Sequence, residues 1–327
     1  MSLLVLTDGG LTKLELQAER WRALRVRDVA SARALAVDPR DPATLYIGTR
    51  GDGAWRSGDG GETWSKLDVP CEDVFALAVS AADGHVYAGC EPSRLYVSED
   101  HGATWSEREA LRQLPSAPTW SFPPRPWTSN VSAIAPHPSR AGLIVVGIEL
   151  GGLMRSEDGG RSWQDHRPGA QRDVHALAWH PSGDGRAYEA AGGGAARSED
   201  HGASWSPVDA ARDLDYCWGL AVTPGEPETW FVSASPSARR AHGDRPARAG
   251  VFRWRGEGPW RRVGDGLPDP LDDMPYALAA DEDRVIVGLR SGRLFQSDDL
   301  GASWRELDVD GAQPGGLWRI AVVPTST

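Results

Sequence analysis

The chain has 327 residues, with 35 Lys and Arg against 46 Asp and Glu, which gives a formal net charge of −11. A hydrophobic content of 40%, including 15 Trp, is sufficient for a packed core and too high for a disordered chain. The acidic balance argues against nucleic acids and anionic membrane surfaces as partners, because both attract basic proteins.

The N-terminus and the cysteines bear on the cellular compartment. The first residues, MSLLVLTDGG, lack the basic region and cleavage site of a signal peptide, and no run of 18 apolar residues occurs. The three cysteines, Cys71, Cys90 and Cys217, are an odd number that does not suit a disulfide framework. We therefore expect a cytoplasmic protein in which Cys71 and Cys90 lie near each other as free thiols.

An octapeptide of the form Ser-x-Asp-x-Gly-x-Ser/Thr-Trp recurs along the chain. Its five copies begin at Ser57, Ser98, Ser156, Ser198 and Ser297. The Asp side chain can accept hydrogen bonds from the backbone ahead of it and close a turn, and the Gly can adopt a positive φ. The Trp opens the next strand with a large ring for the core. Each copy therefore predicts a β-hairpin turn anchored by a hydrophobic side chain.

The tryptophan spacing extends this repeat to copies whose turn has changed. Seven tryptophans follow one another at intervals of 41 to 58 residues, namely Trp21, Trp64, Trp105, Trp163, Trp205, Trp260 and Trp304. A second motif of small and apolar residues keeps step with them, as in ALAV from Ala34 and RIAV from Arg319. With the β-rich run between the two motifs, each unit consists of four short strands, A to D. This pattern is typical of a β-propeller blade.

The two ends of the chain complement each other. Residues 317–323 form an A strand with nothing after it, whereas the N-terminal segments LLVLTDG, LTKLEL and RWRALRV supply B, C and D with no A before them. The sequence therefore predicts one all-β domain over residues 1–327. It is a seven-bladed β-propeller with four-stranded blades, and both termini close the last blade. Rings of six or eight blades are the alternatives.

The octapeptides resemble the Asp-box, also called the bacterial neuraminidase repeat, over almost the whole chain. Such repeats occur in sialidases, xyloglucan-cleaving enzymes, sortilin-type receptors and photosystem II assembly-factor propellers. The segments WSFPPRPWT, DVHALAWHP and YCWGLAV are also similar to a bacterial group labelled sialidase-like or glycosyl hydrolase. The resemblance implies the fold and leaves the activity open, since one fold hosts many functions. No Arg-Ile-Pro motif of the sialidases occurs, so no sialidase roles are transferred.

Geometry singles out one face of such a propeller. The D–A and B–C loops share a face, and the octapeptide turns lie on the opposite one. Residues just before the A strands and just after the B strands form two rings on the first face. The ligand-binding candidates that belong to these rings or adjoin them are Arg33, Arg50, His175, Tyr216, Trp218, Tyr276, Arg290 and Trp318. Aromatic planes suit stacking on a sugar, and arginines suit a carboxylate or phosphate. The alternative is a ring of solvated loop ends.

Two insertions extend the same face. The D–A insertion over residues 111–130 adds the candidates Trp120, Arg125 and Trp127, and the B–C insertion over residues 233–250 adds His242. Long loops on a rigid scaffold commonly carry function, although these tryptophans could instead pack the insertion down. The second insertion also begins a stretch of eight arginines between residues 239 and 262. This stretch could bind an anion or form a solvated surface.

Three carboxylates are candidates for catalysis. Glu91 and Glu149 lie on adjacent blades of the wider ring, and Glu189 lies within a B strand. A two-carboxylate glycosidase needs an acid and a base or nucleophile about 5 to 10 Å apart. A buried Glu189 with a raised pKa could act as a general acid; an outward-facing or salt-bridged Glu is the alternative.

The sequence predicts neither a metal nor a cofactor. No CxxC, HExxH or Gly-rich phosphate-binding loop occurs at the required place. We therefore predict a monomeric propeller that binds a small molecule, such as a sugar or an anion, or a protein partner on the D–A/B–C face. A glycoside hydrolase that uses carboxylates at that mouth is the alternative.

Overall fold

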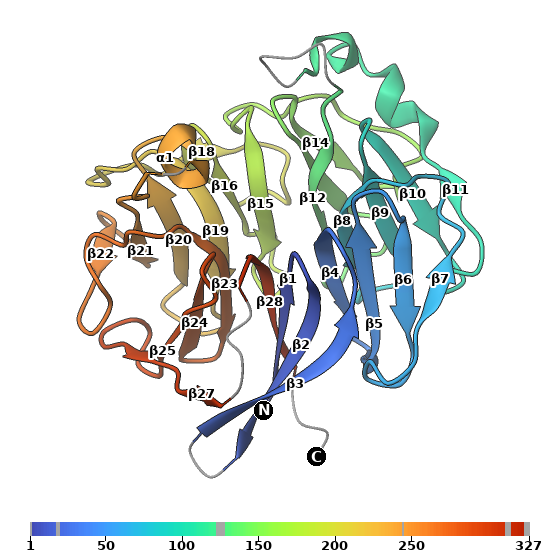
Figure 1. The fold of residues 1–327 in the computed structure, drawn as a ribbon. Coiled ribbons are helices and arrows are strands. Elements are labelled where there is room, and N and C mark those ends of the chain that lie inside the picture. Colours follow the sequence, from blue (N-terminus) through green and yellow to red (C-terminus); the bar gives the residue numbers. More distant parts are fainter. Residues whose placement is uncertain (1, 18–19, 122–127, 244, 311–314, 324–327) are drawn as a thin grey trace.

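The structure is a computed structural model that describes residues 2–17, 20–121, 128–243, 245–310 and 315–323. Seven sheets stand around a central axis, and each runs from an inner strand to an outer edge (Figure 1). The seven-bladed all-β propeller predicted from the sequence is confirmed. No helix in the described ranges has the length and apolar character needed to cross a membrane.

The first six blades follow the chain, and the strands of each are given from the inside outward. Blades 1 to 3 are formed by β4 (Ala32–Asp38), β5 (Asp41–Thr49), β6 (Ala54–Ser57) and β7 (Ser65–Leu67); β8 (Val74–Val79), β9 (Val86–Cys90), β10 (Arg94–Ser98) and β11 (Ser106–Glu107); and β12 (Val131–Pro136), β13 (Ile144–Ile148) and β14 (Gly152–Ser156). Blades 4 to 6 are formed by β15 (Val174–Trp179), β16 (Ala187–Ala191), β17 (Gly194–Ser198) and β18 (Ser206–Pro207); β19 (Tyr216–Val222), β20 (Thr229–Ser235), β21 (Gly250–Arg255) and β22 (Arg261–Val263); and β23 (Pro275–Asp281), β24 (Arg284–Leu289), β25 (Leu294–Ser297) and β26 (Arg305–Glu306).

Blade 3 departs from the four-stranded pattern. Its outer position is reduced to an isolated antiparallel bridge between Arg155 and Gln164. Among the described residues, three short helices lie in the predicted insertions or overlap their ends. They are η1 (Glu109–Gln113) and η2 (Ala117–Thr119) between blades 2 and 3, and α1 (Ala238–His242) between β20 and β21.

Blade 7 is built from both ends of the chain, as predicted. The inner strand β28 (Leu317–Val323) pairs with β1 (Ser2–Thr7), which continues into β2 (Gly10–Gln17) and β3 (Arg20–Asp28). Ser2 lies opposite Val323 in this antiparallel pair, so hydrogen bonds between the two ends close the ring. A fifth strand that the sequence did not suggest, β27 (Val309–Asp310), adds to β3 in parallel orientation.

The octapeptide turns share one set of hydrogen bonds, illustrated by the first copy. Ser57 Oγ accepts from the Gly61 N–H at 2.8 Å and donates to Asp59 Oδ1 at 2.7 Å. Asp59 in turn accepts from the hydroxyl of Thr63 at 2.5 Å and from its backbone N–H at 2.9 Å, and these bonds hold the pKa of Asp59 at about 2. Trp64 Nε1 donates a hydrogen bond to Gly61 O at 2.9 Å, which completes the turn. The aspartates are therefore occupied by the turn, which matches their predicted role.

A β-bulge near the start of every inner strand positions the face opposite these turns. In each case the pairing register with the neighbouring strand shifts, and the residues left without a partner at the shift include Arg33, Phe75, Ser132, His175, Trp218, Tyr276 and Trp318. A bulge sets two residues against one on the partner strand and redirects a side chain. The bulges therefore place one side chain per blade in a ring around the axis.

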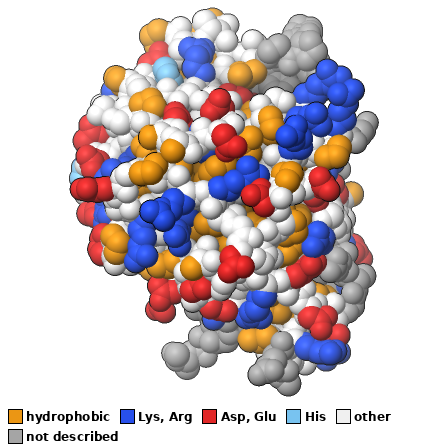
Figure 2. Space-filling view, turned by 90° about the vertical axis from the view of Figure 1, so that its left-hand side faces the viewer, with side chains coloured by type: hydrophobic (Ala, Val, Ile, Leu, Met, Phe, Trp, Pro, Cys, Tyr) orange, Lys and Arg blue, Asp and Glu red, His pale blue; other side chains and the backbone are white. Residues whose placement is uncertain are grey.

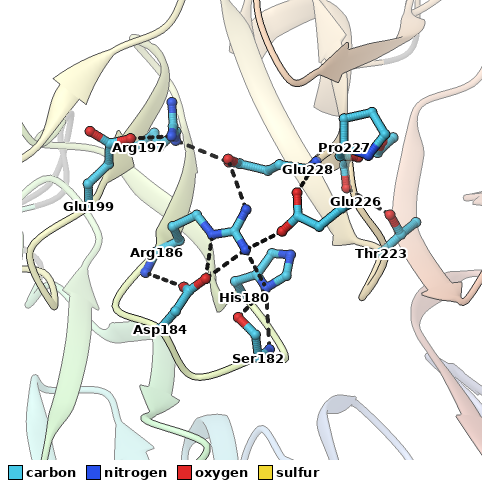
Figure 3. A network of polar contacts seen from close by, with 11 residues as sticks. His180, Ser182, Asp184, Arg186, Arg197, Glu199, Thr223, Glu226, Pro227 and Glu228 are labelled. Atoms are coloured by element: carbon cyan, nitrogen blue, oxygen red, sulfur yellow. Dashed lines mark hydrogen bonds and ion pairs between the residues drawn. The ribbon is translucent and has the colours of Figure 1, made fainter.

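On the octapeptide face, an ionic network joins blades 4 and 5 (Figure 3). The Arg186 guanidinium lies 2.6 Å from carboxylate oxygens of both Asp184 and Glu226, and 3.3 Å from Glu228. Glu228, which is 5% exposed, also pairs with Arg197 at 3.0 Å. The hydrogen bond from Arg186 holds the pKa of Asp184 far below its usual value. Because these groups come from two blades, the network resists their separation.

The cysteine prediction was wrong in part. Cys71 and Cys90 lie together, as expected, but they form a disulfide rather than a free thiol pair. Cys90 ends β9, and Cys71 stands in the loop that leads into the neighbouring strand β8. An odd cysteine count thus coexists with a disulfide because Cys217 is buried separately as a free thiol.

Candidate ligand site at the mouth of the central channel

The seven inner strands enclose a central channel with a volume of about 170 Å³. Its walls include the bulged residues Phe75, Ser132, His175, Trp218 and Tyr276, with small and aliphatic residues below them. Pockets for small organic ligands usually measure about 300–1,000 Å³. The channel therefore has room for water or a small ion, whereas a larger ligand would lie across its mouth.

The bulged residues of blades 4 to 7 are aromatic and contact one another in order. The ring centroids of His175 and Trp218 lie 4.4 Å apart, those of Trp218 and Tyr276 5.2 Å, and those of Tyr276 and Trp318 5.0 Å. These separations are typical of tilted aromatic contacts. Trp218 and Trp318 are only half-buried, so part of this aromatic arc remains accessible at the mouth.

The B–C insertion reaches this arc through His242 at the end of α1. Its Nε2 lies 2.7 Å from Tyr216 Oη, and its Nδ1 forms a hydrogen bond with Tyr276 Oη. The imidazole ring also meets the edge of Trp218, with centroids 4.7 Å apart. His242 nevertheless stays exposed. The insertion is thus fixed to the ring and adds a polar group beside its aromatic planes.

One end of the arc is acidic. Asp173 Oδ2 lies 3.4 Å from His175 Nε2, and Asn130 Nδ2 donates to Glu149 Oε2 at 2.5 Å. Burial raises the pKa of Glu149, an effect that Asn130 and His175 oppose and the nearby charges of Asp173 and Glu91 reinforce. The structure therefore gathers the candidates Glu91 and Glu149 with Asp173, and it leaves Glu149 easier to protonate than an exposed carboxyl group.

The other end is basic. Arg33 forms an ion pair with Asp8 at 2.7 Å, and its guanidinium stacks 4.5 Å from the centre of the Trp318 ring. Trp318 Nε1 donates to the same Asp8 carboxylate at 2.8 Å. The guanidinium of Arg290 lies 5.7 Å from the Tyr276 ring and 5.8 Å from the Trp318 ring. Two arginines thus flank the far end of the aromatic arc.

Sequence reasoning missed three polar members of this site. Asp173 and Asn130 each stand two residues before the bulged residue of their blade, and Asp8 lies in the turn between β1 and β2. All three positions belong to D–A or B–C loops. Their position in the sequence could therefore have identified them, since acidic and amide residues immediately before an inner strand lie at the same mouth as the predicted ligand-binding residues.

Other candidates lie outside the arc. Arg50 is exposed beside Phe75, with its guanidinium 5.8 Å from that ring, on the opposite side of the mouth. Trp120 packs against the core of blades 2 and 3 and donates to Ser116 Oγ at 3.0 Å, so it holds the insertion down. Arg125 and Trp127 lie outside the described residues.

Glu189 occupies a different environment from the other carboxylates. Its side chain is fully buried, and its one hydrogen bond within the described residues comes from the Gln171 N–H to Oε2 at 3.0 Å. Burial raises the pKa of Glu189 to about 8. Of the two alternatives that the sequence left open for Glu189, the structure has the buried carboxyl group with a raised pKa, which a ligand at the mouth cannot touch.

The arginine-rich stretch does not form one continuous patch. Arg253 donates to Leu300 O at 2.6 Å, and Arg262 pairs with Asp269 at 2.5 Å. Figure 2, which views the molecule from the side of β21 and β22, shows basic side chains in separate groups among acidic and apolar ones. Within the described part of the chain, no cluster of three or more His, Cys, Asp or Glu is placed to hold a metal ion.

Comparisons with known proteins agree with this architecture. No model of a known protein family matches the chain. At 26% identity, 95% of the chain aligns with 39% of an oligoxyloglucan-reducing end-specific xyloglucanase from Emericella nidulans. A xyloglucanase from a Paenibacillus species is 34% identical over 116 residues, which are 27% of this chain and 11% of that protein. The chain thus spans well under half the length of these curated relatives.

Solved structures support the same fold. The Niastella koreensis GH74 enzyme superposes with a TM-score of 0.68 at 18% identity, covering 93% of this chain and 51% of that one. YCF48 bound to a D1 peptide superposes with a TM-score of 0.58 at 17% identity, covering 85% of this chain and 81% of that one. The chain is therefore a seven-bladed propeller with xyloglucanase-like neighbours, and its sequence relatives support a glycosyl hydrolase-like propeller at a coarse level.

Proposed function

We propose that this propeller binds a carbohydrate ligand across the mouth of its channel, on the face that carries the D–A and B–C loops. The observation that carries the proposal is the accessible aromatic arc from His175 through Trp218 to Trp318, bounded by carboxylates at one end and arginines at the other. Aromatic planes offer apolar area to the C–H face of a sugar, while polar groups at the edge orient its hydroxyls.

The charge distribution indicates how such a ligand would lie. Asp173 and Glu149 can accept hydrogen bonds from hydroxyl groups at one end. Arg290, which is exposed at the other end, can bind an acidic substituent through its guanidinium. Because the two ends of the aromatic arc carry charges of opposite sign, the site favours one orientation of the ligand. The resemblance of the octapeptides to the Asp-box, and relatives named as xyloglucanases, favour a glucan-type sugar over a protein partner.

Binding is tested with a panel of xyloglucan oligosaccharides and acidic sugars measured by isothermal titration calorimetry. Trp218→Ala and Trp318→Ala should each weaken binding of the best ligand by roughly 5- to 150-fold, since each removes about 1–3 kcal/mol of apolar contact. Trp55→Ala is the matched control, because Trp55 is also half-buried but stands on β6, away from the mouth. Equal affinity in all three variants would contradict the proposal.

A second candidate function, glycoside hydrolysis, is favoured by the raised pKa of Glu149 next to Asp173. A protonated Glu149 could donate to the leaving oxygen while the Asp173 carboxyl group acts as base or nucleophile. Glu149→Gln and Asp173→Asn should then reduce the release of new reducing ends from xyloglucan oligosaccharides by roughly 10²–10⁴-fold. If Glu149→Gln leaves turnover unchanged, hydrolysis at this mouth is refuted while binding can still be measured.

A further inference from the structure

Blade 7 breaks the repeat at one position on the inner strand. The residue that follows the bulged residue is small in the other six blades, where it is Ala34, Ala76, Ala133, Ala176, Gly219 or Ala277, and each of them lines the channel. In β28 the same position is Arg319, which lines the channel as well. A guanidinium thus stands where the rest of the ring has no more than a methyl group.

The surroundings of Arg319 do not neutralise its charge. Its Nη1 donates to the Trp318 carbonyl at 3.1 Å, and no carboxylate within the described ranges forms an ion pair with it. Aliphatic side chains such as Leu278 and Ile320 line the channel around it. The charge of Arg33 acts on Arg319, has the same sign and is already paired with Asp8 at 2.7 Å.

Burial and the neighbouring Arg33 both lower the pKa of Arg319, so this position disfavours the cation. An arginine nevertheless stays protonated in proteins and offers five N–H donors. Arg319 is half-buried and lines the channel, so its charge is partly removed from water without a counter-ion, and an anion that pairs with it would offset that cost. Since one water occupies about 30 Å³ in the liquid, a channel of 170 Å³ has room for a small anion and a few waters.

We propose that the central channel is an anion-binding site in which Arg319 holds a free small anion, of the size of chloride, acetate or phosphate. The site adjoins the sugar site proposed for the mouth, because His175, Trp218 and Tyr276 belong to both. It lies one residue further along β28 from Trp318, inside the channel rather than across it. Bidentate hydrogen bonding by the guanidinium favours the oxyanions over chloride.

Thermal unfolding in sodium phosphate, sodium acetate and sodium chloride, at an ionic strength held constant with a bulky organic sulfonate, tests the proposal. An anion at 100 times its Kd should raise the Tm of the native protein by about 4 °C, and above Kd the rise should follow the logarithm of the anion concentration. Arg319→Ala should abolish this rise. The variant restores the residue that other blades carry, so we expect it to fold. Arg305→Ala, which removes an exposed arginine, is the control and should keep the full response.

A crystal soaked in sodium bromide locates the anion. The proposal requires an anomalous peak in the channel beside Arg319 that disappears in Arg319→Ala. An absent channel peak, or equal Tm responses of the native protein and Arg319→Ala, would overturn it. Arg290→Ala separates the two sites, because Arg290 stands at the mouth and does not line the channel: the variant should weaken binding of an acidic sugar and keep the anion response.

Discussion

Substitution of the buried Glu189 by Gln should remove a large pH dependence of stability. The folded protein holds the pKa of Glu189 at about 8, against 4.5 for an unperturbed glutamate. Between these values the unfolded chain has released the proton and the folded chain has kept it, so the folded state loses stability as the pH rises. The loss is about 1 kcal/mol at pH 5, about 3 kcal/mol at pH 7 and roughly 5 kcal/mol well above pH 8.

The amide introduced by Glu189→Gln would keep a side-chain carbonyl that accepts from the Gln171 N–H, and it cannot ionise. The free energy of unfolding of this variant minus that of the native protein should therefore grow by about 2–3 kcal/mol from pH 5 to pH 7. Equilibrium urea unfolding followed by tryptophan fluorescence at the two pH values measures this difference. Other titrating groups cancel in the subtraction.

The exposed Glu62→Gln variant is the control, and its difference from the native protein should stay flat over this range. A flat difference for Glu189→Gln as well would refute the reasoning. It would mean that the carboxyl group ionises normally in the folded state and is therefore hydrated or paired.

Two further changes test contacts between and within blades. Arg186→Met should lower the free energy of unfolding by about 2 kcal/mol, because the buried Glu228 would lose one of the two ion pairs that it forms within the described residues. Urea unfolding measures this loss, and an effect no larger than that of Arg305→Met would show that the network is not stabilising. Reduction of the disulfide, which spans 19 residues, should lower stability by roughly 3 kcal/mol. Calorimetry of the native protein with and without a reductant measures this loss. A Cys71→Ser, Cys90→Ser protein is the control, because the reductant should not change its Tm. An unchanged Tm of the native protein would contradict the prediction.

The fold could be predicted because its determinants are local and repeated. The Trp in each octapeptide packs against its own turn, as Trp64 does on Gly61, and the inner-strand motif marks where each blade begins. The unpaired strands at the two ends then left one way to close the ring. Local pattern could not reveal β27, because a two-residue strand forms only when its parallel partner β3 is already in place.

The site was predictable in position and less so in detail. Counting back from each inner strand identified Trp218, Tyr276 and Trp318, and the bulges that project them occur at these residues. The repeat pattern does not indicate whether a side chain in an insertion faces solvent or the core. Trp120 is therefore among the predicted ligand-binding residues although it packs inward. The disulfide was missed for a different reason: Cys71 and Cys90 were expected to be close, but an odd number of cysteines does not decide whether two neighbouring sulfur atoms are bonded.

The mouth and the channel share β28, which has a consequence for how their two ligands would interact. Trp318 contacts the proposed sugar, and the next residue, Arg319, contacts the proposed anion. Arg33 stacks on Trp318 and acts on Arg319 as a like charge, so an anion on Arg319 would reduce the repulsion between the two guanidinium groups. Binding of the anion should therefore hold Arg33 and the Trp318 ring in place and strengthen sugar binding, and linkage requires the reverse effect by the same factor.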